Sequence, residues 1–250
     1  MDQRFGIGLD RRLELDWLEA AAELASAGCS PADARSQLWL RLEGALAGDT
    51  PQSARGKTLT VLSRIWLTPP TNLRWLRNQA LGILAENPGS RRLAPHWAMM
   101  LAAYPFFATL AGTVGGLLAI EDRVPLALVT RRLKERLGDR SSVPRATQRA
   151  LRTLVSWNVL RETGDKGVYQ RAEKPATISP TASHLLIAAL VTTSEQNFLA
   201  IDYAADHPAL FPFRIALTPH ELRTAPNLDV NRQGLDLDVV RLRPSAGALC

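Results

Sequence analysis

The sequence contains only two cysteines, Cys29 and Cys250, which lie too far apart to form a C-x-x-C pair or a zinc-binding pattern. A disulfide framework is therefore not expected, and this cysteine usage is typical of a protein in a reducing cytosol. The four histidines are scattered as well, because none has a second histidine or a cysteine three or four residues away. Local metal ligation is thereby excluded, and we expect neither a metal nor another cofactor.

The sequence also lacks the motifs of common enzyme classes. Residues 55–58 read Arg-Gly-Lys-Thr, but a phosphate-binding loop needs a glycine where Pro51 stands, and a strand before it. Neither a Gly-x-Ser-x-Gly motif nor a cysteine–histidine arrangement suggests nucleophilic catalysis. Asp202, Asp206 and His207 could act together in acid–base or metal chemistry, although the end of a surface helix explains them better. We therefore predict no catalytic residue and no enzymatic activity.

A membrane-spanning helix is not expected either. Residues 97–120 carry no charge and could cross a bilayer by length. Only about a third of them are Leu, Ile, Val or Phe, which supply most of the energy of insertion. Pro105 suits the first turn of a new helix, so we predict two buried helices, at about residues 96–103 and 106–120. The second carries glycines that would allow a neighbouring helix to approach closely: Gly112, Gly115 and Gly116. The N-terminus lacks a continuous apolar core, so no signal peptide is expected.

The positive charge of the chain is concentrated in one segment. Residues 123–174 contain thirteen Lys and Arg against five Asp and Glu, a net charge of +8. The whole chain has a net charge of +6, so the remaining residues sum to −2. A localised basic segment in a chain that is otherwise slightly acidic is typical of a nucleic-acid binder.

Two helices and a hairpin are predicted in this segment. Pro125 suits the first turn of a helix whose apolar residues recur at helical spacing up to Leu137, and Gly138 can end it. Ser142 is a candidate N-cap for a second helix that ends near residues 157–158. Its apolar side comprises Ala150, Leu151, Leu154 and Val155. Residues 159–163 and 168–171 then alternate as strands do, around a glycine-rich turn.

This pattern resembles the winged helix-turn-helix superfamily, over about residues 105–172. The resemblance implies that the second helix faces the DNA major groove with Arg145, Gln148, Arg149 and Arg152, and that Lys166 brings the wing toward the backbone. Long side chains that form hydrogen bonds suit base recognition, and nearby cations suit phosphates. The candidate phosphate contacts are Arg131, Arg132, Lys134, Arg136, Arg140, Lys166 and Arg171.

We therefore expect a cytoplasmic, bacterial protein that binds double-stranded DNA, either as a regulator or as an accessory subunit of a multi-gene system such as antiviral defence. A homodimer is expected, because many helix-turn-helix proteins read two half-sites. The alternative is a scaffold in a larger assembly, whose basic helix meets an acidic protein partner. A nuclease or nucleotide hydrolase is the weakest interpretation, because Glu135, Asp139 and Glu162 are too few and too dispersed.

The predicted fold is mainly α, with an N-terminal helical bundle in residues 1–92, the winged domain in residues 93–174 and a small α+β domain in residues 175–250. Cap-plus-proline starts, at Ser30-Pro31 and Thr50-Pro51 among others, predict four helices in the bundle. After residue 175 we expect helices at residues 184–191 and 196–205, an edge strand at 211–217, a short helix from Pro219, and a hairpin formed by 228–230 and 237–242.

Overall fold

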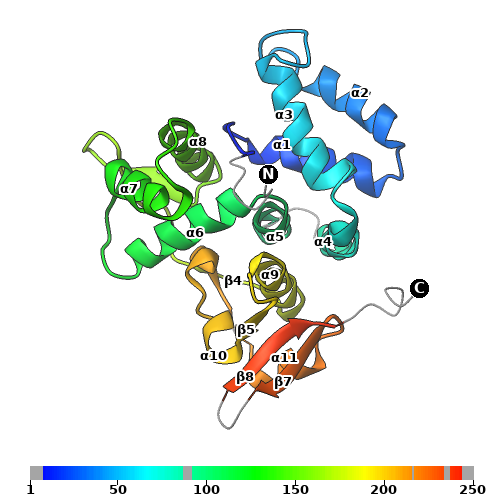
Figure 1. The fold of residues 1–250 in the computed structure, drawn as a ribbon. Helices are drawn as coiled ribbons and strands as arrows, with labels where there is room; N and C mark the ends of the chain where they lie inside the picture. The colour runs from blue at the N-terminus through cyan, green and yellow to red at the C-terminus, as the bar shows by residue number, and fades with distance from the viewer. Residues whose placement is uncertain (1–7, 87–91, 216, 234–236, 244–250) are drawn as a thin grey trace.

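The computed structural model describes residues 8–86, 92–215, 217–233 and 237–243. The fold is mainly helical, as predicted, with small sheets between and after the helices (Figure 1). The buried apolar residues form one continuous cluster that extends from Leu9 to Val240. The cluster includes residues on both sides of the predicted domain boundaries near residues 92 and 174. These boundaries remain sequence predictions.

Four helices form the N-terminal part, as the sequence predicts. Their bounds are α1 Leu15–Ser26, α2 Pro31–Arg41, α3 Ala54–Leu62 with a π-helical extension η2 Ser63–Leu67, and α4 Arg74–Glu86 after the 3-10 turn η3 Thr71–Leu73. The predicted cap at Ser30 is confirmed, because its side chain accepts a hydrogen bond from the backbone N–H of Asp33. The start at Thr50-Pro51 is wrong: α3 begins three residues later, capped by Ser53, whose side chain accepts from the N–H of Gly56.

The uncharged stretch forms two helices, α5 Leu93–Ala103 and α6 Pro105–Leu118, and most of their residues are buried. The break at Pro105 is thus confirmed. Among the described residues, no single helix is long and apolar enough to span a membrane. Taken together, α5 and α6 have the length and the apolar composition of a membrane span, but the chain bends by 118° between them.

The basic segment contains the predicted helices and hairpin, together with one further strand. The elements after α6 are β1 Val124–Pro125, α7 Leu126–Leu137, α8 Ser142–Ser156, β2 Leu160–Glu162 and β3 Val168–Arg171. The strands form an antiparallel sheet in the order β1-β3-β2, with Pro125 opposite Val168 and Arg161 opposite Gln170. Pro125 therefore lies in an edge strand and not in the first helical turn. The predicted cap by Ser142 is also wrong, because α8 begins at Ser142 and has no side-chain cap hydrogen bond.

The C-terminal part mixes helices with two small sheets. Its elements are β4 Ala176–Thr177, α9 Pro180–Thr193, β5 Phe198–Ala200, α10 Ile201–Ala204, η4 Pro208–Leu210, β6 Phe213–Arg214, α11 Pro219–Thr224, β7 Leu228–Gln233 and β8 Leu237–Leu242. Strand β4 pairs with β6 in parallel, and β5-β8-β7 form an antiparallel sheet. The predicted hairpin and the helix from Pro219 are confirmed, although residues 234–236 of the turn lie outside the described residues. The helix predicted at residues 196–205 is wrong, because strand β5 occupies its first half.

Trp97 of α5 joins α6 and α8 to the C-terminal part of the chain. Its ring makes edge contacts with Phe107 of α6, Trp157 at the end of α8, and Phe211 and Phe213 of the C-terminal part, at centroid distances between 5.0 and 6.2 Å. Its indole N–H donates a hydrogen bond to the carbonyl oxygen of Ala209 at 2.9 Å. Because buried aromatic contacts of this kind are directional as well as apolar, they fix helix α8 relative to its neighbours.

Candidate nucleic-acid interface

Helix α8 has one buried side and one exposed side. The predicted apolar residues Ala150, Leu151 and Leu154 are buried, and Val155 is half-buried. The exposed side carries Arg145, Gln148 and Arg152, separated by three and four residues. Residues at this spacing lie next to one another on a helix surface. Three of the four residues expected to face a groove are therefore exposed together.

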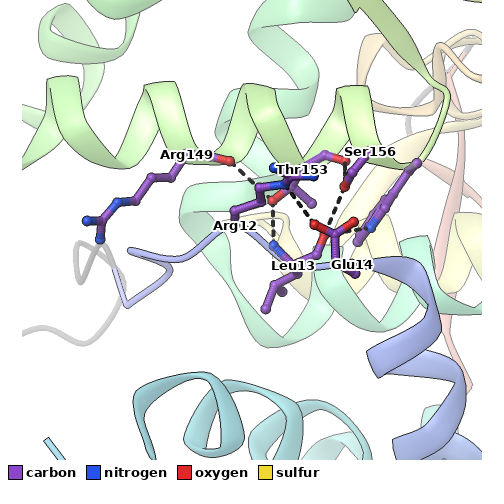
Figure 2. A network of polar contacts seen from close by, with 7 residues as sticks. Arg12, Leu13, Glu14, Arg149, Thr153 and Ser156 are labelled. Carbon is purple, nitrogen blue, oxygen red and sulfur yellow. Dashed lines mark hydrogen bonds and ion pairs between the residues drawn. The ribbon is translucent and has the colours of Figure 1, made fainter. Parts of the chain in front are cut away.

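The N-terminal segment, residues 8–14, lies along one flank of α8. Figure 2 shows Leu13 beside Thr153 and Ser156. The N–H of Leu13 donates to Thr153 Oγ1 at 2.9 Å, and the carbonyl oxygen of Leu13 accepts from Ser156 Oγ at 3.1 Å and from Trp157 Nε1 at 3.0 Å. These bonds satisfy backbone groups that are otherwise without partners in a buried position. The segment therefore covers one flank of α8 and leaves the outer side open.

Asp10, in the same segment, binds an arginine of α8. Arg149 Nη1 donates to both the carboxylate Oδ1 and the backbone oxygen of Asp10, each at 2.6 Å. The Arg149 side chain is only 31% exposed as a result, whereas the Arg145 side chain is 66% exposed and lies 3.9 Å from the same carboxylate oxygen. The resemblance implies that Arg149 faces the groove, but its guanidinium is held by an ion pair with Asp10 of the same chain.

The cations of α7 and its following loop are at the surface. Arg131 and Arg132 are exposed and both lie near Glu135, at 3.8 and 3.4 Å. Lys134 pairs with Asp139 at 2.7 Å, and Arg136 and Arg140 are exposed. Exposed pairs of this kind contribute little stability, so the arginines can exchange their carboxylate partners for phosphates at small cost.

The two candidates on the hairpin differ in exposure, because Lys166 is exposed and Arg171 is half-buried. Lys166 is exposed in the turn between β2 and β3, beside an ion pair of Arg123 and Asp165 at 3.0 Å. Arg171, at the end of β3, instead donates to the carbonyl oxygen of Phe211 at 2.7 Å, and its guanidinium lies 5.5 Å from the centre of the Phe211 ring. Burial lowers the pKa of Arg171. Arg171 therefore links the hairpin to the C-terminal part, and it is not placed as a free phosphate contact.

His96 and His207 both contact groups of the protein itself. His96 is fully buried with Nε2 3.1 Å from Glu19, and burial is the main cause that lowers its pKa. His207 Nδ1 accepts from the N–H of Ala209 at 3.1 Å, and burial lowers its pKa to about 4. His207 is therefore neutral near pH 7 and caps η4, which explains its place beside Asp206 without acid–base chemistry. Among the described residues, no group of three or more His, Cys, Asp or Glu could hold a metal ion.

The Arg-Gly-Lys-Thr sequence lies within helix α3 and forms no loop. Arg55 is buried there, where it contacts Asp49 and lies 4.6 Å from the centre of the Trp39 ring. Its role is to hold α3 against α2, which agrees with the expectation that this sequence is not a phosphate-binding loop. Comparison of the chain with protein-family models, curated proteins and solved structures gives no match.

Proposed function

We propose that this protein binds duplex DNA through a winged helix-turn-helix formed by α6, β1, α7, α8, β2 and β3, with α8 in the major groove. The observation that carries the proposal is the exposed side of α8, where Arg145, Gln148 and Arg152 lie together while the opposite side packs in the core. The element order and the antiparallel β1-β3-β2 sheet support the same assignment.

The side chains suit this role chemically. The major groove admits an α-helix, and Arg and Gln form paired hydrogen bonds with guanine and adenine edges. Lys166 on the hairpin, with Arg131, Arg132 and Arg140 of α7 and its loop, would reach backbone phosphates, which position a protein without reading sequence. Such a protein would act in the bacterial cytoplasm as a regulator or as an accessory subunit of a multi-gene system such as antiviral defence.

The proposal is tested by measuring the affinity of the protein for a fluorescent duplex over a range of salt concentrations. Each neutralised phosphate lowers the slope of log K against log salt by about 0.9, so four contacts give a slope of about −3.6. Absence of binding at micromolar protein in low salt would contradict DNA binding.

One observation favours a second candidate function, a scaffold that binds an acidic protein. Arg149 already holds a carboxylate, that of Asp10, at 2.6 Å. An acidic partner could meet the other arginines of α8 in the same way. Recovery of a stoichiometric acidic partner, together with no duplex binding at low salt, would support this candidate instead.

Asp10 should weaken DNA binding, because its negative charge lies beside the proposed interface. Replacement of Asp10 by Asn keeps an oxygen that can accept from Arg149 but removes the charge. We expect Asp10→Asn to raise duplex affinity several-fold, up to about tenfold at ~0.1 M salt, and to steepen the salt slope by up to about 0.9. Asp16→Asn is the matched control, since Asp16 is exposed on α1 and makes no ion pair within the described part of the chain. Lower affinity in Asp10→Asn would show that the carboxylate positions Arg149 for binding and does not compete with DNA.

A further inference from the structure

A cavity of about 520 Å³ lies on the other side of the N-terminal segment from α8. The segment forms one wall through Gly8, Asp10 and Arg11, helix α3 with η2 forms a second, and the junction of α5 and α6 forms the third. Arg11, Lys57 and Arg64 bring three cationic side chains to this cavity. The sequence gives no sign of it, because Arg11 is far along the chain from Lys57 and Arg64, and all three lie outside the basic segment.

Two of these cations have no partner among the described residues. Within the part of the chain that the structure describes, neither the Arg11 nor the Lys57 side chain makes a hydrogen bond or an ion pair. Arg64 donates through Nε to the carbonyl oxygen of Ala103 at 3.3 Å and lies 5.7 Å from the centre of the Tyr104 ring. Its two terminal nitrogens form no hydrogen bond with any described residue. Three cationic side chains around one cavity, none of them paired with a described carboxylate, favour an anion there.

The acid at this cavity is already neutralised. Among the described lining residues the one carboxylate belongs to Asp10, and Arg149 of α8 binds it at 2.6 Å. Asp10 thus belongs both to the cavity wall and to the flank of α8. The cavity and the exposed arginines of α8 are therefore neighbours on the two sides of one short segment.

From this arrangement we infer that the cavity formed by Arg11, Lys57 and Arg64 holds backbone phosphates of the same nucleic acid that α8 contacts. This rests on the proposed DNA binding and extends it, because the N-terminal helices then form part of the interface. A volume of about 520 Å³ accommodates a phosphate with its attached sugar. Continuity with α8 favours a nucleic-acid backbone over a free phosphorylated compound as the source of the phosphate.

The test compares two double variants with the same loss of charge. The cavity variant is Arg11→Gln with Lys57→Gln. The control variant is Arg74→Gln with Arg214→Gln, at exposed arginines that have no ion pair within the described residues and line neither the cavity nor α8. Affinity for one duplex is measured at several salt concentrations, with thermal unfolding to check the fold.

We expect the cavity variant to lose about tenfold in affinity per phosphate contact at ~0.1 M salt, and its salt slope to become shallower by about 1.8. The control variant should keep the wild-type slope. If the cavity variant binds like the control while substitution of Arg145 and Arg152 abolishes binding, the cavity inference is wrong and the proposed function stands. If the wild type binds no duplex, both are wrong.

A second arm identifies the source of the phosphate. Thermal unfolding of the wild type is followed with increasing inorganic phosphate, and a ligand that binds the folded state raises the midpoint. A shift in the wild type that is lost in the cavity variant, together with unchanged duplex affinity, would assign the cavity to a free phosphate compound and overturn the nucleic-acid assignment.

Discussion

Arg145→Glu combined with Arg152→Glu is expected to reduce duplex affinity at least 100-fold at ~0.1 M salt, because each substitution removes a phosphate or base contact worth about tenfold. The new carboxylates would also repel the backbone, so the loss should exceed this figure. The fold should be retained, since both side chains are exposed and neither is bound as tightly as Arg149. Anisotropy titration of a labelled duplex measures the loss, and circular dichroism checks the helices.

The matched control for this prediction is Arg74→Glu combined with Arg214→Glu, which changes the net charge equally at exposed arginines away from α8. The control should lose only the affinity due to net charge, a small fraction of the effect. Equal losses in the two variants would mean that binding follows the overall charge, and the assignment of α8 as the recognition helix would then be wrong.

Arg149 is left out of this experiment for a structural reason. Its guanidinium donates to the backbone oxygen and to the carboxylate Oδ1 of Asp10. A glutamate at position 149 would therefore place two carboxylates against each other. Like charges in contact would push the N-terminal segment away from α8 and could alter the fold. Loss of binding by an Arg149 variant would therefore not distinguish a lost DNA contact from a displaced segment.

The elements of the basic segment could be predicted because their signals are local. The spacing of Val129 and Leu133 predicts α7, and that of Ala150, Leu151 and Leu154 predicts α8, since each helix must bury one side. The hairpin follows from alternation on both sides of a turn that ends at Gly167, whose φ of 75° favours glycine.

Contacts between distant parts of the chain could not be predicted. Leu13 is 140 residues away from its partner Thr153, and Asp10 is 139 residues away from Arg149. A hydroxyl or an arginine on a helix gives no sign of which distant segment will meet it. The same reason explains why the strand at Val124–Pro125 is not predicted from the sequence. Its pairing with β3 is set by tertiary contacts, and its position at the edge of the sheet allows Pro125, which lacks an N–H to donate.

The helix expected at residues 196–205 failed for a related reason. Asn197 has a φ of 56°, a left-handed conformation that interrupts a helix, and the following residues pair with β8, which lies about forty positions later. Residues 198–200 are apolar enough for a helix or a strand, so their pairing with β8 determines that they form a strand.

Gly115→Ala is the substitution with the largest expected effect on stability. A Cβ at this position would lie 1.9 Å from the carbonyl oxygen of Pro208 and 2.8 Å from its carbonyl carbon. These are backbone atoms of η4, which His207 caps and whose Ala209 accepts the Trp97 N–H, so they cannot rotate away. We expect α6 and η4 to be forced apart at a cost of about 3 kcal/mol, at the upper end for overpacked cores. For a chain of this size the midpoint of thermal unfolding should fall by roughly 6–12 °C.

Gly112→Ala provides the control on the same helix. All three glycines of α6 are expected from the sequence to permit a close approach, yet a Cβ at Gly112 or Gly116 would meet no atom within 4 Å, so this expectation holds for Gly115 alone. Since alanine favours the helix over glycine by up to about 1 kcal/mol, Gly112→Ala should leave the unfolding midpoint unchanged or raise it slightly. Equal midpoints for the Gly115 and Gly112 variants, measured by calorimetry, would contradict the tight contact between α6 and η4. Because that contact also positions Phe211 against the ring of Trp97, a lower midpoint for Gly115→Ala should be accompanied by a change in tryptophan fluorescence that Gly112→Ala does not show.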